Sequence, residues 1–373
     1  MVKRILQYFR RETVLSAALI CALLSFLLTP PSVIHLQGID TTTLLMLFSL
    51  MTIVAGFRRM GALDAVSRKL TRRVMTLRGL SAVMVALCFV LSMLVTNDVA
   101  LLTLVPLTLL LFRAGGQKST IWTVVLETVA ANLGSMVTPI GNPQNLYLYG
   151  LAGVGAGQFI MWLLPYTIVS ATLLIISIML LKNKNADVSM KDTDDNSGQK
   201  AAPVNVLLYT ILFIIALLVV ARVLPWYVLT VLVLVTTFII ERNVLLKADY
   251  ALLLTFVGFF IFTGNMGRIE PVALFLSGIA DGREIGVGII TSQCISNVPA
   301  ALLLSGFTHN IKNLALGVNI GGLGTLIASM ASLISYKQYV NEVPDGKGKY
   351  FVTFTVYNVI FLIVLYACTK FFI

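Results

Sequence analysis

The chain has 373 residues, of which 58% are hydrophobic and only 12% charged, and its mean hydropathy is +0.93. A soluble domain of this size cannot cover its surface with so few polar residues, so the composition indicates a polytopic membrane protein. The net charge of +11 could suggest a nucleic-acid partner, but the distribution of the basic residues along the chain argues against one.

Continuous apolar runs of about 17–25 residues are long enough to cross a hydrocarbon core as helices, and they exclude the short alternating strands of an outer-membrane barrel. We therefore expect an all-α fold with about nine spans. The spans cover residues 14–29, 40–57, 119–151, 159–181, 204–221, 225–240, 250–266, 312–336 and 350–371, and the third and eighth of them are broken helices.

Two further apolar stretches, 79–113 and 282–307, are each interrupted by an Asn motif and are expected to fold back there. Several of the resulting arms are too short to cross a membrane at about 1.5 Å per residue. We interpret both stretches as re-entrant hairpins, although the first arm, 79–95, is long enough to cross.

The chain also contains an internal duplication. Thr96-Asn97-Asp98 recurs as Ser296-Asn297-Val298, and the eighteen residues from Asn132 to Tyr149 share six identities with those from Asn319 to Tyr336. Polar, helix-breaking residues at membrane depth are tolerated only where they line a cavity or are buried in protein. A duplicated pair of such breaks is typical of a transporter whose binding site lies at the repeat interface.

The duplication divides the chain into an N-terminal repeat over 1–181 and a C-terminal repeat over 204–373. Between them, residues 182–203 are polar and nearly charge-balanced, which predicts a disordered cytoplasmic linker. The basic stretch 58–78 is interpreted as an amphipathic interfacial helix that anchors the topology, with specific lipid binding as the alternative.

The basic residues fix the expected orientation. With the N-terminus in the cytoplasm, 22 of the 27 Lys and Arg residues lie on that side, which satisfies the positive-inside rule. The five outside are Arg222, Arg268, Arg283, Lys312 and Lys370. The first hairpin then opens to the cytoplasm and the second to the exterior, so the two repeats have opposite topology in a bacterial inner (plasma) membrane.

Three segments, Val95 to Pro106, Asn132 to Leu146 and Ser296 to Ala300, carry a family resemblance. Their order and spacing resemble the ion transporter superfamily, and within it the divalent-anion:sodium symporters, the citrate and arsenite permeases and the melanosomal P protein. The resemblance covers nearly the whole chain. It implies a scaffold domain and a mobile transport domain, usually in a homodimer that works by an elevator motion.

The resemblance also implies a set of binding residues. Asn97 and Asn297 match hairpin-tip asparagines that help form two cation sites in the sodium-coupled members, with Thr96 and Ser296 beside them. The loops of the broken helices complete these sites and face the substrate. The matching residues are Gly134, Thr138 and Asn145 with their repeat mates Gly321, Thr325 and Ser332, and the same breaks add Asn132, Asn142, Asn319 and Ser329 as candidates. Half-helix N-termini suit an anion there, and unwound carbonyls suit a cation.

Two acidic residues are candidates for coupling, because an intramembrane carboxylate is costly and usually faces a cavity. Asp98 at the first tip either binds the coupling ion or proton or caps the returning arm. Glu127 is either a second coupling group or a buried, hydrogen-bonded or interfacial side chain. The sequence Asn97-Asp98 is closer to the arsenite permeases, whereas the first break is closer to the dicarboxylate branch, so the substrate stays open.

These patterns predict a secondary active transporter that moves a small anion, di/tricarboxylate-like or inorganic, coupled to Na⁺ or H⁺ and without another cofactor. Its expected partners are the anion, the lipid bilayer and a second copy of the chain. The alternatives within transport are arsenite or antimonite efflux and Na⁺/H⁺ antiport. A membrane enzyme or scaffold is disfavoured because the sequence shows no His/Glu metal pair, Ser/His arrangement or nucleotide-binding motif.

Overall fold

The structure is a computed structural model that describes residues 12–29, 38–61, 74, 76–112, 116–181 and 203–372. This part of the chain is built from helices and contains no strand, as the composition predicts. Most of the basic stretch 58–78 and nearly all of the linker lie outside the described residues. The helices of the N-terminal repeat are α2 (Thr13–Ser25), α4 (Thr41–Arg59), α6 (Leu77–Val95), α7 (Asn97–Leu111), α8 (Gln117–Ser135), α9 (Pro143–Ala152) and α10 (Ala156–Met179).

In the C-terminal repeat the hairpin, the broken helix and the last helix follow in the same order, but four helices precede them instead of the two described in the N-terminal repeat. The C-terminal repeat contains α11 (Pro203–Val220), α12 (Trp226–Glu241), η2 (Arg242–Lys247), α13 (Tyr250–Met266), α14 (Glu270–Ala280), α15 (Glu284–Ile295), α16 (Asn297–Leu304), η3 (Ser305–Phe307), α17 (Ile311–Gly321), α18 (Met330–Glu342), η4 (Pro344–Gly346) and α19 (Lys347–Phe372).

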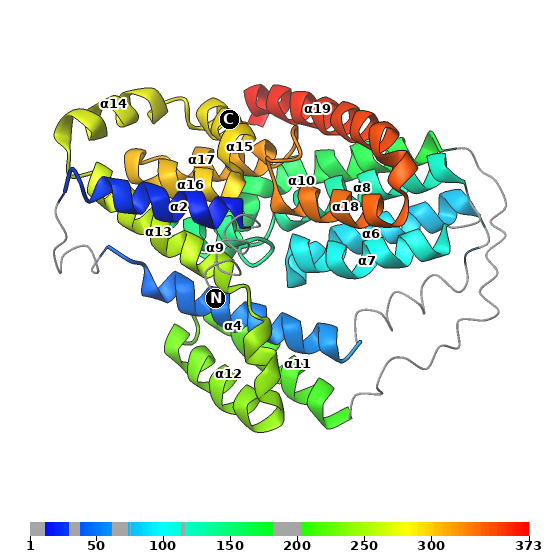
Figure 1. Cartoon of the computed structure of the whole chain (residues 1–373), viewed down its shortest axis with the longest axis horizontal. Coiled ribbons are helices and arrows are strands. Elements are labelled where there is room, and N and C mark those ends of the chain that lie inside the picture. The colour runs from blue at the N-terminus through cyan, green and yellow to red at the C-terminus, as the bar shows by residue number, and fades with distance from the viewer. Residues whose placement is uncertain are drawn as a thin grey trace.

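The helices form two groups (Figure 1). Helices α4, α11 and α12 with η2 pack on one another and form what we call the small bundle. The large bundle contains α6 to α10 and α15 to α19, and the pair α2 and α13 packs beside it. The hairpins and broken helices all belong to the large bundle, so the duplicated motifs are brought together in one body.

Two hairpins form where the Asn motifs predict them. Helices α6 and α7 pack along each other and meet at Thr96, and α15 and α16 do the same at Ser296. The broken helices are α8 with α9 and α17 with α18, and both breaks fall inside the predicted ranges 119–151 and 312–336.

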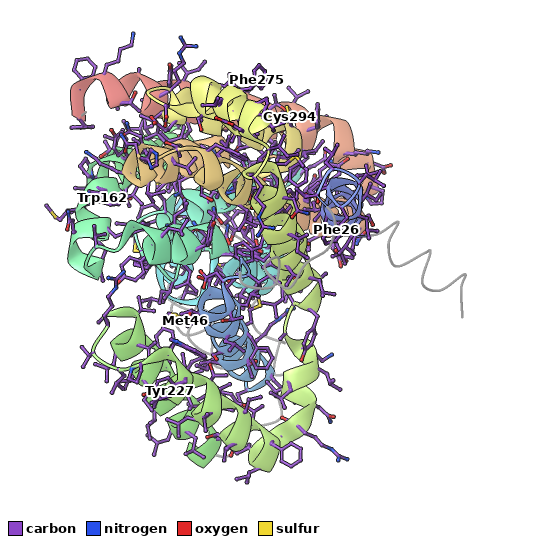
Figure 2. All side chains as sticks on the ribbon, turned by 90° about the vertical axis from the view of Figure 1, so that its left-hand side faces the viewer. Phe26, Met46, Trp162, Tyr227, Phe275 and Cys294 are labelled. Carbon is purple, nitrogen blue, oxygen red and sulfur yellow. The ribbon has the colours of Figure 1, made fainter. Side chains whose placement is uncertain are left out.

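Within the described part of the chain, five helices can by length and composition cross a membrane alone, and α13 with α14 makes a sixth if this bent pair counts as one span. The remaining candidates are shorter apolar helices or halves of broken ones, so the nine spans, the re-entry of the hairpins and the elevator arrangement stay predictions. Large apolar side chains point outward over much of the surface, as Tyr227 on α12 and Phe275 on α14 do in Figure 2. Such a surface suits a lipid environment rather than water.

Helix α14 is not among the predicted elements. It meets α13 at an angle of 109°, and Pro271 lies in its first turn, where the missing N–H of proline costs nothing. Leu274 and Phe275 on this short helix are both 67% exposed. The segment has too few residues for a membrane span, so its short apolar run does not predict a spanning helix.

Candidate functional site

The hairpin tips have nearly the same backbone geometry. Thr96 has φ 82° and ψ 148°, and Ser296 has φ 77° and ψ 153°, so a single non-glycine residue at positive φ reverses the chain in each repeat. Such a conformation costs about 1–3 kcal/mol and persists only where the surroundings enforce it. The next residue supplies part of that enforcement, because Asn97 N donates to Gly141 O at 3.1 Å and Asn297 N donates to Ala328 O at 2.9 Å. Each tip is thereby fixed to the break of its own repeat.

The breaks begin and end where the sequence stops supporting a helix. Helix α8 ends at Ser135, and α9 starts at Pro143, with Asn142 as its N-cap accepting a hydrogen bond from Asn145 N at 2.9 Å. In the second repeat, α17 ends at Gly321 and α18 starts after Ser329. Both second halves therefore present an N-terminus to the centre of the large bundle.

A crossed set of hydrogen bonds joins the two breaks. Asn319 of the second repeat accepts from Asn142 Nδ2 at 3.0 Å and donates to Asn145 Oδ1 at 2.6 Å. In the opposite sense, Asn132 of the first repeat accepts from Ser329 Oγ at 2.9 Å and donates to Ser332 Oγ at 3.5 Å. We call these six residues the crossed network, and all of them are at least 96% buried. Equivalent positions of the two repeats thus bind each other reciprocally.

The first tip joins this network directly, because Asn97 Nδ2 donates to Asn132 Oδ1 at 3.3 Å. The candidate threonines hold the breaks against the hairpins instead. Thr138 Oγ1 donates to Met93 O at 2.6 Å, and Thr325 Oγ1 donates to Gln293 O at 3.4 Å. Their hydroxyls are therefore used by the protein itself in this conformation.

The candidate glycines permit close helix packing. A Cβ on Gly321 would lie 2.7 Å from Ser292 Oγ and 3.0 Å from Ile289 Cα, and a Cβ on Gly134 would lie 2.6 Å from Ser92 Oγ. These are the same contacts in the two repeats, between a broken helix and the first arm of a hairpin. Both glycines are explained by packing, and the structure gives them no side-chain role toward a ligand.

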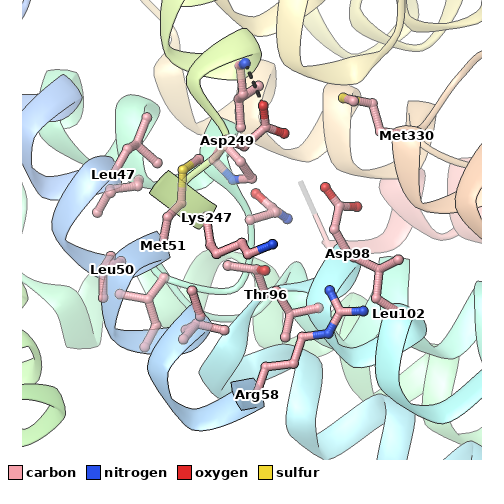
Figure 3. A pocket seen from close by; sticks show the side chains of 18 of the residues that line it. Leu47, Leu50, Met51, Arg58, Thr96, Asp98, Leu102, Lys247, Asp249 and Met330 are labelled. Carbon is pink, nitrogen blue, oxygen red and sulfur yellow. Dashed lines mark hydrogen bonds between the residues drawn. The ribbon is translucent and has the colours of Figure 1, made fainter. Parts of the chain in front are cut away.

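Asp98 borders a cavity of about 690 Å³ between the large and the small bundle. Figure 3 shows Asp98 and Thr96 of the first hairpin facing Arg58 of α4 and Lys247 of η2 across this cavity. The carboxylate of Asp98 accepts no hydrogen bond within the described residues, and α7 has no side-chain cap. The capping alternative therefore finds no support in this conformation, whereas a cavity next to the carboxylate, with Arg58 and Lys247 in its largely apolar wall, does favour contact with an ion.

A second, much smaller cavity separates the two tips. It is about 10 Å³ in volume and is lined by Asn97, Asp98, Asn297 and Ser329, among others. This volume corresponds to roughly one water-sized particle. Both tip asparagines and the carboxylate of Asp98 thus surround a space in which a single small ion fits.

Glu127 does not lie with these residues. It is fully buried in the middle of α8, where its Oε1 accepts a hydrogen bond from Thr108 Oγ1 at 2.5 Å. The candidate residues from the sequence therefore separate into a central group around the crossed network and tips, and Glu127 apart from it.

Three polar residues near the site were not among the predicted ones. Arg58 and Lys247 were counted only as topology anchors, although they line the larger cavity. Gln293 holds the second break, because its Nε2 donates to Gly321 O at 2.8 Å and Leu323 O at 2.9 Å. Gln293 is a polar residue within the apolar hairpin 282–307, which is the signal that could have indicated it.

Comparisons with known proteins identify the family of the chain. The model of the citrate transporter family matches residues 5–313. An uncharacterized transporter of Methanocaldococcus jannaschii is 33% identical over 355 residues, which cover 95% of both chains. The inner membrane protein YbiR of Escherichia coli is 32% identical over 304 residues, which cover 80% of both chains. An uncharacterized transporter of Mycobacterium tuberculosis is 24% identical over 337 residues, which cover 80% of this chain and 78% of its own.

These matches confirm the resemblance to the citrate and arsenite permeases, and the apolar helices of the fold agree with an integral membrane protein. Proteins of this kind are transporters and not enzymes. The chain therefore belongs to the citrate transporter family.

Proposed function

We propose that the protein is a secondary active transporter that moves a small anion, di/tricarboxylate-like or inorganic, across the bacterial inner membrane with Na⁺ or H⁺ as the coupling ion. The crossed network carries this proposal. It places two half-helix N-termini and a set of buried amides at one point, and such ends attract anions through their unpaired N–H groups and their dipoles.

The larger cavity supports an anionic substrate. Its volume of about 690 Å³ falls within the range of about 300–1,000 Å³ typical of small-molecule sites. Arg58 and Lys247 line it and make no ion pair within the described residues, whereas the neighbouring Arg59 pairs with Glu241. Asp98 and Asp249 line the same cavity, so its wall carries charges of both signs, and Arg58 and Lys247 are the groups that can bind an anion there.

The smaller cavity supports a coupling cation. It lies between Asn97 and Asn297, whose amide oxygens suit Na⁺, and the carboxylate of Asp98 borders it as a counter-charge. Protonation of Asp98 is the alternative means of coupling at the same position.

We further propose that the small bundle acts as a scaffold against which the large bundle moves, and that the exposed apolar face of α12, with Val231 and Phe238, contributes to a homodimer.

The proposal is tested in two steps. Purified protein is first screened for thermal stabilisation by Na⁺ and by dicarboxylates, citrate, sulfate and arsenite, because a ligand of the folded state must stabilise it. Proteoliposomes then measure uptake of the stabilising anion with and without Na⁺ and a pH gradient. Arsenite efflux, or Na⁺/H⁺ exchange that needs no anion, would replace the proposed anion transport.

The tip asparagines provide the matched variants. Asn97→Ala and Asn297→Ala are each expected to abolish uptake in protein that still inserts and folds. Asn243→Ala removes the same side chain from an exposed position on η2 and is expected to leave uptake unchanged. Wild-type uptake rates in both tip variants would show that the site is assigned to the wrong residues.

A further inference from the structure

Glu127 is a carboxyl group without a compensating charge. No basic side chain forms an ion pair with it in the described part of the chain. Thr108 Oγ1 donates to its Oε1, and its Oε2 has no hydrogen-bond partner. An ionised carboxylate buried in this way would cost several kcal/mol, whereas a neutral carboxyl group avoids most of that cost.

The pattern of hydrogen bonds agrees with a bound proton. In a protonated carboxyl group, one oxygen is a carbonyl acceptor and the other an O–H donor. Oε1 already acts as an acceptor, and Oε2 is the atom left over. A buried O–H of this kind requires a partner. Two titratable groups interact with Glu127 from neighbouring helices, Cys88 of α6 and Tyr350 of α19.

Six helices pack against α8, which carries Glu127, and they are α6, α7, α10, α17, α18 and α19. Helix α7 contributes the neutral Thr108, and its one acid, Asp98, lies ten residues away at the tip, about 15 Å along a helix. Helices α10 and α17 carry no acid, and the one basic residue of α17 lies in its first turn. The titratable groups of the packed helices are Arg78 and Cys88 (α6), Asp98 (α7), Tyr166 (α10), Lys312 (α17), Tyr336, Lys337, Tyr339 and Glu342 (α18), and Lys347, Lys349, Tyr350, Tyr357, Tyr366, Cys368 and Lys370 (α19).

Two buried tyrosines connect Glu127 to the start of α8. The Tyr350 hydroxyl lies beside Thr128 and the Tyr339 hydroxyl beside Gln117, and the two rings are stacked with centroids 4.7 Å apart. Tyr339 also lines a cavity of about 250 Å³ together with Gln117 and Thr120 from the start of α8. Tyr350 interacts with Glu127 and stacks on Tyr339, which lines the cavity, so the two tyrosines connect the carboxyl group to the cavity, and hydroxyls with bridging water relay protons along such a connection.

We propose that Glu127 is a proton-binding site, separate from the hairpin tips and reached from the cavity at the start of α8 through Tyr339 and Tyr350. A proton from water in this cavity forms the O–H bond at Oε2, and the same bond breaks when the proton leaves. No other bond changes. This site deepens the proposed transport function, because a group that binds and releases protons inside the large bundle makes transport respond to pH.

Infrared spectroscopy of the purified protein tests the site without any transport. Wild-type protein at neutral pH is expected to show the C=O band of a protonated carboxyl group, and Glu127→Gln is expected to remove it. Thr108→Val removes the hydrogen bond to Oε1 and is expected to shift the band to higher frequency. A carboxyl band of unchanged intensity in Glu127→Gln would overturn the proposal, whereas loss of intensity supports it and any weaker remaining band is assigned with Asp98→Asn. If that variant does not fold, Thr108→Val decides, since an unshifted band refutes the site and a shifted one supports it.

The path is tested by kinetics. After a rapid change of pH, the carboxyl band in Tyr339→Phe and Tyr350→Phe is expected to respond more slowly than in the wild type, at an unchanged final amplitude. Tyr357→Phe, on the same helix as Tyr350, is the control and is expected to respond at the wild-type rate. Equal rates in all variants would overturn the path.

Transport measurements then separate this inference from the proposed function. If no screened anion is transported by the wild type, the proposed function fails while the infrared result stands. If an anion is transported, Glu127→Gln is expected to lose the pH dependence of net uptake and to keep anion exchange. Wild-type pH dependence in Glu127→Gln would overturn the link between this proton and transport.

Discussion

Arg222 joins the small bundle to the large one at the turn between α11 and α12. Its Nη1 donates to Gly153 O at 2.9 Å and its Nη2 to Tyr149 O at 3.4 Å, and the guanidinium lies 5.0 Å from the centroid of the Tyr149 ring. Gly153 caps the C-terminus of α9, where a cation is favoured by the helix dipole. We call this group of contacts the Arg222 clasp.

The backbone at Arg222 shows that the side chain matters. Its φ is 62°, and Val223 N donates to Leu218 O at 2.9 Å, which is the hydrogen bond of a Schellman motif. Glycine usually occupies this position, because any other residue there costs about 1 kcal/mol. An arginine is therefore retained at an energetic cost that its contacts offset.

The size of the effect follows from these contacts. Arg222 is exposed, so its shorter hydrogen bond contributes about 1 kcal/mol and the contact with the Tyr149 ring about 0.5–1 kcal/mol. Their loss in Arg222→Ala is expected to weaken the clasp by about 1–2 kcal/mol, or about 5–30-fold in the equilibrium constant. Arg222→Gly loses the same contacts but regains about 1 kcal/mol of backbone strain, so its effect is smaller.

Hydrogen exchange of the purified protein measures this effect. Amides at the end of α9 and in the α11–α12 turn are expected to exchange about 5–30-fold faster in Arg222→Ala, and less so in Arg222→Gly. Arg242→Ala, an exposed arginine on the same bundle without a hydrogen bond or ion pair among the described residues, is the control. Equal exchange in Arg222→Ala and the control would refute the clasp.

Three further outcomes are expected. Gly321→Ala forces a methyl group onto Ser292 and is expected to destabilise the protein by about 1–3 kcal/mol in thermal unfolding. In the control Gly157→Ala the new methyl group meets nothing within 4 Å, so stability is expected to stay nearly unchanged. Equal stabilities of the two variants would contradict the packing role of Gly321. Gln293→Met leaves two carbonyls of the second break unpaired and is expected to lower the unfolding temperature, and an unchanged value would show that the break holds itself. If H⁺ is the coupling ion, Asp98→Asn is expected to lose net uptake but keep anion exchange. If Na⁺ is the coupling ion, the variant is expected to lose both, along with its stabilisation by Na⁺. Wild-type behaviour would leave Asp98 without a coupling role.

Much of the fold could be predicted because its signals are local. An apolar run long enough for a helix, and a polar residue that interrupts it, can each be read without knowledge of the rest of the chain. Thr96 and Ser296 were found in this way, and so were the breaks after Ser135 and Gly321. The repeat then added information, since each motif occurs twice.

The pairing within the site could not be predicted, because it depends on contacts between residues far apart in the chain. The hydrogen bond from Asn142 to Asn319 spans 177 positions, and nothing near either residue specifies the other. Likewise, Arg58 belongs both to a basic stretch that orients the chain and to the wall of a cavity, and only the packing of the two bundles shows the second role. The positive φ of Arg222 has no local signal either, since arginine rarely adopts it.

Arg58, which lines the larger cavity, and the Arg222 clasp lie toward opposite ends of α4. Phe57, next to Arg58 at the end of α4, contacts Tyr209 and Phe213 in the middle of α11, whereas Gly150 near the end of α9 lies beside Thr43 at the start of α4.

On the positive-inside rule, the end with Arg58 is expected to face the cytoplasm. Under the transport function proposed above, this conformation would combine a cavity on the cytoplasmic side with a contact between the bundles at the other side. A transporter that opens one side must keep the other closed, so releasing the clasp would then be part of the energetic cost of facing outward.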